Sequence, residues 1–240
     1  MKKLLLATAL LTFGAGFAAA DVVRLGTEGA YPPYNFINDK GEVDGFERKF
    51  GDELCKRAAL ECTWTTNEWD SIIPNLQSGN YDVIIAGMSI TPERGEVVDF
   101  SQPYIPPASS AYLALSKDAD LKSGAVAAQT STIQAAFVAE NGMTVVEYAT
   151  PEETVAAVKN GEAVAVLADK DYLKPIADES NGELILLDKE EVIGGGVGMA
   201  FRKSDTELRG KMDAAITSMK EDGSLNVMIA EFFGPEANTW

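Results

Sequence analysis

The sequence contains no histidine and only two cysteines, Cys55 and Cys62. Imidazole and thiolate are the usual ligands of zinc and of redox-active metals, so we expect no transition-metal site. A catalytic pair built on histidine is excluded as well. Basic residues are scarce, since 20 Lys and Arg stand against 37 Asp and Glu, a net charge of −17. Such a chain repels a phosphate backbone, and nucleic acid is not an expected partner.

Long apolar runs are also missing, because no stretch approaches the about 18 residues that a membrane span requires. Residues 1–20, MKKLLLATALLTFGAGFAAA, combine two lysines, a short apolar core and an alanine-rich end. This pattern is typical of a secretory signal peptide and predicts an exported protein. In an exported protein, Cys55 and Cys62 favour one small disulfide loop over a metal site.

The remaining chain alternates short β-rich runs with helical patterns, which predicts an α/β fold. Strand, helix, strand, helix and strand are expected in turn over residues 22–88, and the pattern restarts over residues 125–169. Helices between strands imply mostly parallel sheets with right-handed crossovers. Extended stretches at residues 109–118 and 196–202 separate the two halves. They predict a two-strand hinge between two lobes, with a ligand cleft at the carboxyl ends of the strands.

Two helix starts carry capping signals in the second half of the chain. Thr150 with Glu153, and Ser204 with Glu207, match the capping-box spacing. We therefore expect helices to begin at both places.

The stretch AGMSITPERG, residues 86–95, follows a buried strand and therefore lies at the expected cleft. Thr91-Pro92 predicts a turn or short helix, with Arg94 in its first turn. A guanidinium near a helix start is suited to binding a small carboxylate. The alternative is a solvent-exposed ion pair of Arg94 with Asp99 or Glu93.

Five motifs extend the interpretation to nearly the whole chain: GTEGAYPPYNF, GEVDGFERKFGDELCKR, the run from WDSIIPNLQSG to DFSQPY, AVLAD, and GVGMAFRKSDTELRGK. In this order they resemble the periplasmic solute-binding proteins of amino-acid ABC importers, in particular the histidine and lysine/arginine/ornithine binders. The resemblance implies a type II two-lobed fold, with residues 21–111 and 199–240 in one lobe and 112–198 in the other. It also implies the Cys55–Cys62 disulfide known in basic-amino-acid members.

The resemblance further implies which residues hold the backbone groups of an amino acid. Arg94 corresponds to the clamp on the α-carboxylate, aided by Ser131 and Thr132. Asp169 corresponds to the acceptor of the α-ammonium group. The remaining residues implied for this part of the site are three neighbours from the first half, Gly87, Met88 and Ser89.

The ligand side chain would meet a second group of residues. Glu28 corresponds to an acidic position that faces the distal cation of basic ligands. Tyr31 and Trp69 would form apolar and cation–π walls, with Tyr34 as a secondary wall. The alternatives are core positions for Trp69 and Tyr34 and an exposed loop charge for Glu28.

The sequence departs from the histidine-type members at four positions, namely Ala86, Gly87, Thr130 and Ile133. These changes make the pocket less polar and leave open an opine or a neutral polar amino acid such as glutamine. A periplasmic enzyme resembling cyclohexadienyl dehydratase remains a further alternative, since one scaffold hosts different functions. We expect a monomeric periplasmic binding protein, not an enzyme, with no cofactor and an ABC permease as partner.

Overall fold

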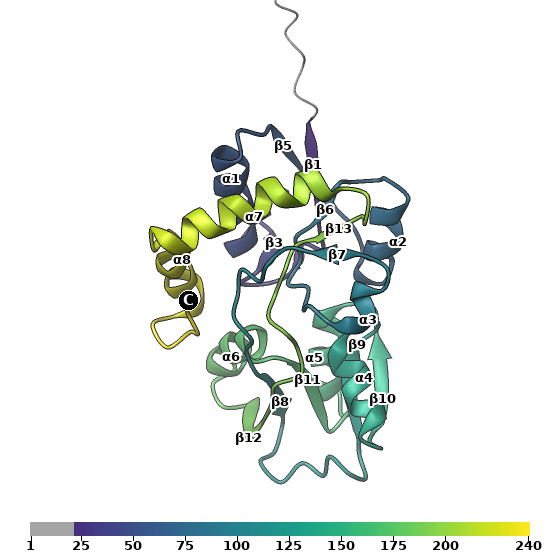
Figure 1. Cartoon of the computed structure of the whole chain (residues 1–240). Helices are drawn as coiled ribbons and strands as arrows, with labels where there is room; N and C mark the ends of the chain where they lie inside the picture. Colours follow the sequence, from purple (N-terminus) through teal and green to yellow (C-terminus); the bar gives the residue numbers. More distant parts are fainter. Residues whose placement is uncertain (1–21) are drawn as a thin grey trace, which may run out of the picture.

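The computed structural model describes residues 22–240, and the expected signal peptide lies outside the described residues. Two five-stranded sheets, each with its own helices, lie one above the other (Figure 1). We call them the first lobe and the second lobe. The predicted two-lobed α/β architecture is confirmed. Within residues 22–240 no helix combines the length and apolar character of a membrane span.

The first lobe is built on a sheet in the order β5-β1-β6-β13-β7. Its strands are β1 (Val23–Thr27), β5 (Cys62–Thr66), β6 (Val83–Ile84), β7 (Asp99–Phe100) and β13 (Ala200–Phe201). A small separate sheet contains β2 (Ala30–Tyr31), β3 (Asn35–Ile37) and β4 (Val43–Asp44). The helical elements of this lobe are α1 (Phe46–Arg57), the 3₁₀ helix η1 (Trp69–Ser71), α2 (Ile72–Gln77), α3 (Pro92–Gly95), α7 (Thr206–Glu221) and α8 (Ser224–Phe233).

The second lobe repeats this plan with the strand order β10-β9-β11-β8-β12. Its strands are β8 (Ser110–Ala114), β9 (Ala125–Gln129), β10 (Thr144–Tyr148), β11 (Ala165–Asp169) and β12 (Ile185–Glu191). Its helices are α4 (Ile133–Glu140), α5 (Pro151–Lys159) and α6 (Lys170–Glu179). As expected, the two halves of the chain share one strand-and-helix plan.

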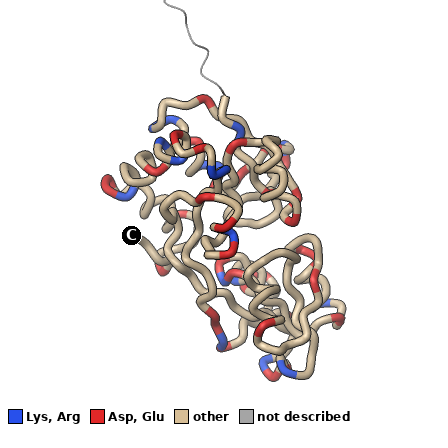
Figure 2. The backbone as a smooth tube through the Cα atoms, turned by 45° about the vertical axis from the view of Figure 1, so that its right-hand side comes forward, with Lys and Arg blue, Asp and Glu red and all other residues tan. Residues whose placement is uncertain are grey.

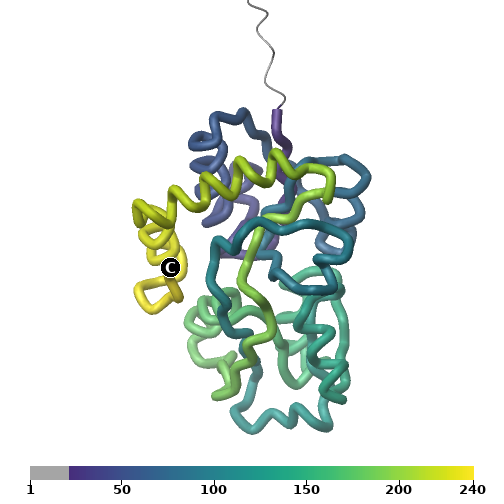
Figure 3. Tube along the Cα trace, viewed as in Figure 1, coloured from purple at the N-terminus to yellow at the C-terminus, as the bar shows by residue number. Residues whose placement is uncertain are grey.

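The chain passes between the lobes twice, and the two passages lie side by side (Figure 3). They are joined by an antiparallel bridge between Ile105 and Val197. After each passage the chain enters a sheet as an antiparallel strand, β8 in the second lobe and β13 in the first. In each sheet four strands run in one direction and only this strand runs against them, so the sheets are mostly parallel, as the sequence pattern predicts. The boundaries after residues 111 and 198 stay a prediction, while β8 already begins at Ser110 and β13 begins at Ala200.

The two expected capping boxes have different outcomes. The Thr150 hydroxyl accepts from the Glu153 backbone N–H while the Glu153 carboxylate accepts from the Thr150 N–H, so this box is confirmed. The box at Ser204 is wrong, because α7 begins one residue later with Asp205 at its N-cap. Ser204 instead donates to the Asp205 carboxylate, and Glu207 pairs with Lys211.

Two further features concern the disulfide and the distribution of charge. The disulfide between Cys55 and Cys62 is present and fastens the end of α1 to the start of β5. Charged residues of both signs are spread along the traces of both lobes (Figure 2).

Candidate ligand-binding site

A cavity lies where the carboxyl ends of strands from both lobes meet. Eight residues proposed from the sequence line it: Glu28, Tyr31, Trp69, Gly87, Ser89, Arg94, Thr132 and Asp169. Four more line it as well: Ala86, Gln129, Ile133 and Gln134. The topology thus gathers residues that lie far apart in the chain.

Arg94 points into this cavity from α3. The Thr91 hydroxyl caps the helix by accepting from the Arg94 N–H at 3.1 Å. The guanidinium donates to the Ser89 carbonyl at 2.9 Å and, across the lobes, to the Ser131 carbonyl at 3.2 Å. Burial lowers the Arg94 pKa to about 10, which still leaves the group charged at neutral pH. Asp99 pairs instead with Arg209 at 3.0 Å, so the exposed Arg94–Asp99 pair is not formed.

Asp169 enters the cavity from the end of β11. The Tyr31 hydroxyl donates to its Oδ2 at 3.0 Å, and Gln134 Nε2 donates to its Oδ1 at 2.9 Å. Burial raises the Asp169 pKa to about 6, although the Tyr31 hydrogen bond works in the opposite direction. A cation placed here would relieve the cost of ionising a buried carboxyl group.

Glu28 lies directly after β1 and reaches the second lobe. Gln129 Nε2 donates to Glu28 Oε1 at 2.6 Å and is also held by the Ala149 carbonyl at 3.1 Å. Burial raises the Glu28 pKa to about 7, the Gln129 hydrogen bond lowers it, and the charge of Glu47 raises it further. Glu28 is therefore half-buried and hydrogen-bonded across the lobes, which argues against the exposed loop charge.

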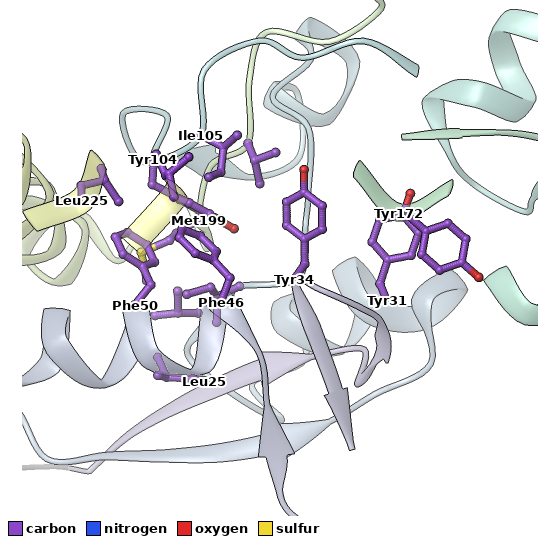
Figure 4. Packing of buried hydrophobic residues seen from close by; sticks show 14 of the residues in the cluster. Leu25, Tyr31, Tyr34, Phe46, Phe50, Tyr104, Ile105, Tyr172, Met199 and Leu225 are labelled. Carbon is purple, nitrogen blue, oxygen red and sulfur yellow. The ribbon is translucent and has the colours of Figure 1, made fainter. Parts of the chain in front are cut away.

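Aromatic rings complete the cavity and join the lobes. Tyr31 stacks on Tyr172 of α6 at a centroid distance of 4.4 Å and on Tyr34 at 5.7 Å (Figure 4). Trp69 is 8% exposed, and its indole N–H donates to the Ser131 carbonyl at 3.3 Å. The Arg94 guanidinium lies 5.3 Å from the centre of the Trp69 ring. Flat apolar walls of this kind suit an aliphatic stem or a delocalised cation.

Three residues proposed from the sequence lie outside the cavity lining. The Met88 side chain is fully buried in a core cluster with Trp69 and Ile72. Ser131 contributes its carbonyl to Arg94 and Trp69 rather than standing in the lining. Tyr34 is 2% exposed and lines a neighbouring cavity together with Ser89 and Asp169.

Sequence reasoning missed Gln129 and Gln134, which orient the two carboxylates of the cavity. Gln129 is the last residue of β9, and Gln134 lies in the first turn of α4. A polar residue at the carboxyl end of a buried strand is the signal that could have identified Gln129. Among residues 22–240, no group of His, Cys, Asp and Glu is arranged to hold a metal ion.

Comparison with known proteins finds chains that are similar over nearly the whole length. The ABC transporter arginine-binding protein 1 of Escherichia coli is 32% identical, with 97% of this chain and 99% of the relative covered. The lysine/arginine/ornithine-binding periplasmic protein of the same organism is 30% identical, with 97% of each chain covered. A Silicibacter pomeroyi periplasmic protein of the His/Glu/Gln/Arg/opine-binding family, solved with lysine, is 69% identical. Its TM-score is 0.90, with 91% of this chain and 100% of that chain covered.

The family model for bacterial extracellular solute-binding proteins, family 3, matches residues 23–235. This span includes both lobes, both passages between them and every residue that lines the cavity. The chain belongs to family 3 of the bacterial extracellular solute-binding proteins.

Proposed function

We propose that this protein binds a basic amino acid between its lobes and delivers it to the permease of an ABC importer. The observation that carries the proposal is that the cavity holds a second carboxylate, Glu28, in addition to Asp169. Arg94 and Asp169 suffice for the carboxylate and ammonium groups of any amino acid. Glu28 is then left over, and a buried carboxylate is stabilised by a partner cation such as the distal charge of arginine, lysine or ornithine.

Lobe closure would follow from the same contacts. Glu28, Trp69 and Arg94 come from the first lobe, whereas Asp169 and Thr132 come from the second. A ligand that touches both groups interacts more favourably with the closed arrangement and shifts the population toward it. The closed form would be the state offered to the permease in the periplasm.

A binding role fits the cavity better than catalysis. A dehydratase needs a general acid aimed at a leaving group, and Glu28 and Asp169 are the carboxyl groups that line the cavity. Both are held by glutamine amides, Gln129 and Gln134, which fix them as hydrogen-bond acceptors. An assay that monitors turnover of prephenate and arogenate by ultraviolet absorbance tests this part of the proposal. We expect no turnover, and turnover of either compound would contradict it.

A thermal-shift screen of ligand-stripped, refolded protein tests the ligand class. The set contains the twenty amino acids, ornithine, citrulline and several opines. At 100 times Kd a ligand adds about 2.7 kcal/mol of stability, or about 5 to 10 °C in Tm for a chain of this size. We expect such shifts with arginine, lysine or ornithine and smaller ones with glutamine. A shift confined to neutral or acidic amino acids would contradict the role of Glu28.

A further inference from the structure

A second buried carboxylate, Glu47, lies behind the cavity and does not line it. It belongs to the first turn of α1, within the GFERKF motif. Glu47, Asn35 and Tyr104 are all 0% exposed. Burial raises the Glu47 pKa, while hydrogen bonds from Tyr104, Gly87 and Asn35 lower it. An ionisable group buried at such cost has a defined set of partners, and these partners lead to the binding site.

One oxygen of Glu47 fixes the loop that carries Arg94. The Gly87 N–H donates to Glu47 Oε1 at 2.6 Å. Gly87 has φ +61°, a left-handed conformation, and its Cα faces the Tyr31 ring. Ser89 and Arg94 follow this turn, so their direction depends on how the Gly87 peptide is held.

The other oxygen of Glu47 fixes the loop that carries Glu28. Asn35 Nδ2 donates to Glu47 Oε2 at 2.7 Å, and Asn35 Oδ1 accepts from the Gly29 N–H at 2.6 Å. The Glu47 N–H also donates to the Tyr34 carbonyl at 2.8 Å. The loop between β1 and β3 is therefore tied to the same carboxylate as the loop after β6.

Tyr104 extends these ties to the passage between the lobes. Its hydroxyl donates to Glu47 Oε1. Its backbone N–H donates to the Val197 carbonyl at 2.8 Å, where the two passages meet. Figure 4 shows Tyr104 beside Ile105 and Met199, with Tyr34 standing between this group and Tyr31.

We propose that Glu47 is a positioning residue for the ligand pocket, which sets the loops of Glu28 and Arg94 relative to each other and to the hinge. The proposal rests on the proposed function in so far as ligand affinity is its readout. Glu47 itself does not touch the ligand, and its contribution passes through the Gly87 and Gly29 peptides.

The chain offers a charge-preserving exchange that isolates this role. Glu47→Gln keeps one acceptor oxygen but places an amide NH₂ against either the Asn35 amide or the Gly87 N–H. Adding Asn35→Asp restores every partner, because the amide introduced at position 47 then donates to the carboxylate introduced at position 35. That carboxylate still accepts from the Gly29 N–H. The double variant thus keeps every hydrogen-bonded partner and the native net charge, and only the direction of the bond between positions 35 and 47 is reversed.

Asp82→Asn serves as the matched control. Asp82 lies at the opposite end of β6 and accepts from Arg24 at 2.8 Å and Arg202 at 3.0 Å. Its amide variant also removes one negative charge and hydrogen-bonded ion pairs from the first lobe. A general loss of stability in that lobe would therefore appear in this variant too.

Amide hydrogen exchange of the ligand-free proteins and calorimetry with L-arginine and L-lysine test the proposal. For Glu47→Gln we expect at least tenfold faster exchange at Gly87 and Gly29 and at least tenfold weaker binding. Asp82→Asn should change each by less than threefold, and the double variant should return both to within threefold of wild type.

Two results would overturn the proposal. One is exchange at Gly87 and Gly29 that is no faster in Glu47→Gln than in Asp82→Asn. The other is a double variant with the wild-type Tm that still binds as weakly as Glu47→Gln. If the double variant does not fold, exchange in the single variants decides. Wild-type protein that binds neither amino acid would refute the proposed function, and the exchange result would still decide the role of Glu47.

Discussion

Binding of basic amino acids should weaken steeply as the pH falls from 8 to 6, because a cationic ligand needs Glu28 ionised. The Glu28 pKa is about 7 in the ligand-free pocket, and a bound cation would hold the carboxyl ionised. The apparent Kd then rises by a factor of 1 + 10^(pKa − pH), in which the pKa is that of Glu28 in the ligand-free protein. This factor is about 1.1 at pH 8, about 2 at pH 7 and about 11 at pH 6. Asp169, with a pKa of about 6, adds a further factor of about 2 at pH 6.

Calorimetry with arginine at pH 8, 7 and 6 and constant ionic strength measures this dependence. We expect about a twentyfold loss of affinity between pH 8 and pH 6 in wild type. In Glu28→Gln, affinity should already be reduced at pH 8, and the remaining loss should be only about twofold, from Asp169. Glutamine serves as the control ligand, and Glu28→Gln should weaken it less than arginine.

Ligand binding weakens as the pH falls, whereas the contribution of Glu28 to the stability of the ligand-free protein should increase as the pH falls. The folded protein raises the Glu28 pKa from 4.5 to about 7, so it binds more protons than the unfolded chain between these values. Stability from this group is therefore complete below pH 4.5 and is lost as the pH rises through 7, by at most about 3 kcal/mol. Urea unfolding at pH 8 should find Glu28→Gln more stable than wild type. Two binding results would refute the reasoning. One is an arginine Kd that changes by less than threefold between pH 8 and pH 6, and the other is a pH dependence of arginine binding that is the same in Glu28→Gln as in wild type.

Three further perturbations have distinct expected results. Arg94→Ala should weaken amino-acid binding by about 3 to 5 kcal/mol, because a desolvated carboxylate loses its partner; calorimetry within threefold of wild type would show that the clamp lies elsewhere. Tyr31→Phe removes the hydroxyl that bridges the lobes to Asp169 and should weaken binding by about 1 to 2 kcal/mol, and a change under twofold would exclude that contribution. Replacing Cys55 and Cys62 by serine opens a loop with a sequence separation of 7 residues. It should lower the free energy of unfolding by about 2 to 3 kcal/mol with ligand preference unchanged; an altered order of arginine, lysine and glutamine would contradict this.

The sequence was sufficient to predict the parts of the fold that depend on local periodicity. Helix α1 and strands β1, β5 and β9 to β11 follow directly from apolar spacing. The antiparallel direction of β8 and β13 could not be predicted, because alternation of apolar residues does not record strand direction. Both strands were interpreted as connecting segments, although each occupies an interior position of a sheet.

The candidate site was predictable where a residue follows a strand into the cleft, as for Arg94 and Asp169. Met88 follows the left-handed turn at Gly87, and the residue order alone does not show that its side chain packs in the core instead of lining the cavity. Gln129 and Gln134 were missed because an amide at a strand end or a helix start is common on protein surfaces. Their role depends on carboxylates that approach from distant segments.

The interruption of the first lobe by the second dictates the order in which the chain can complete its domains. All five strands of the second lobe come from one continuous stretch, Ser110 to Glu191. In the first lobe, β13 lies between β6 and β7, so β7 has no place in the sheet until residues 200 and 201 arrive. Pairing β7 with β13 closes a long loop that contains the second lobe, and this closure carries an entropic cost. The second lobe reduces that cost once it is folded, because it brings its own two ends together. The second lobe can therefore complete its sheet from one continuous stretch of chain, whereas the sheet of the first lobe is complete only when β13 has been added.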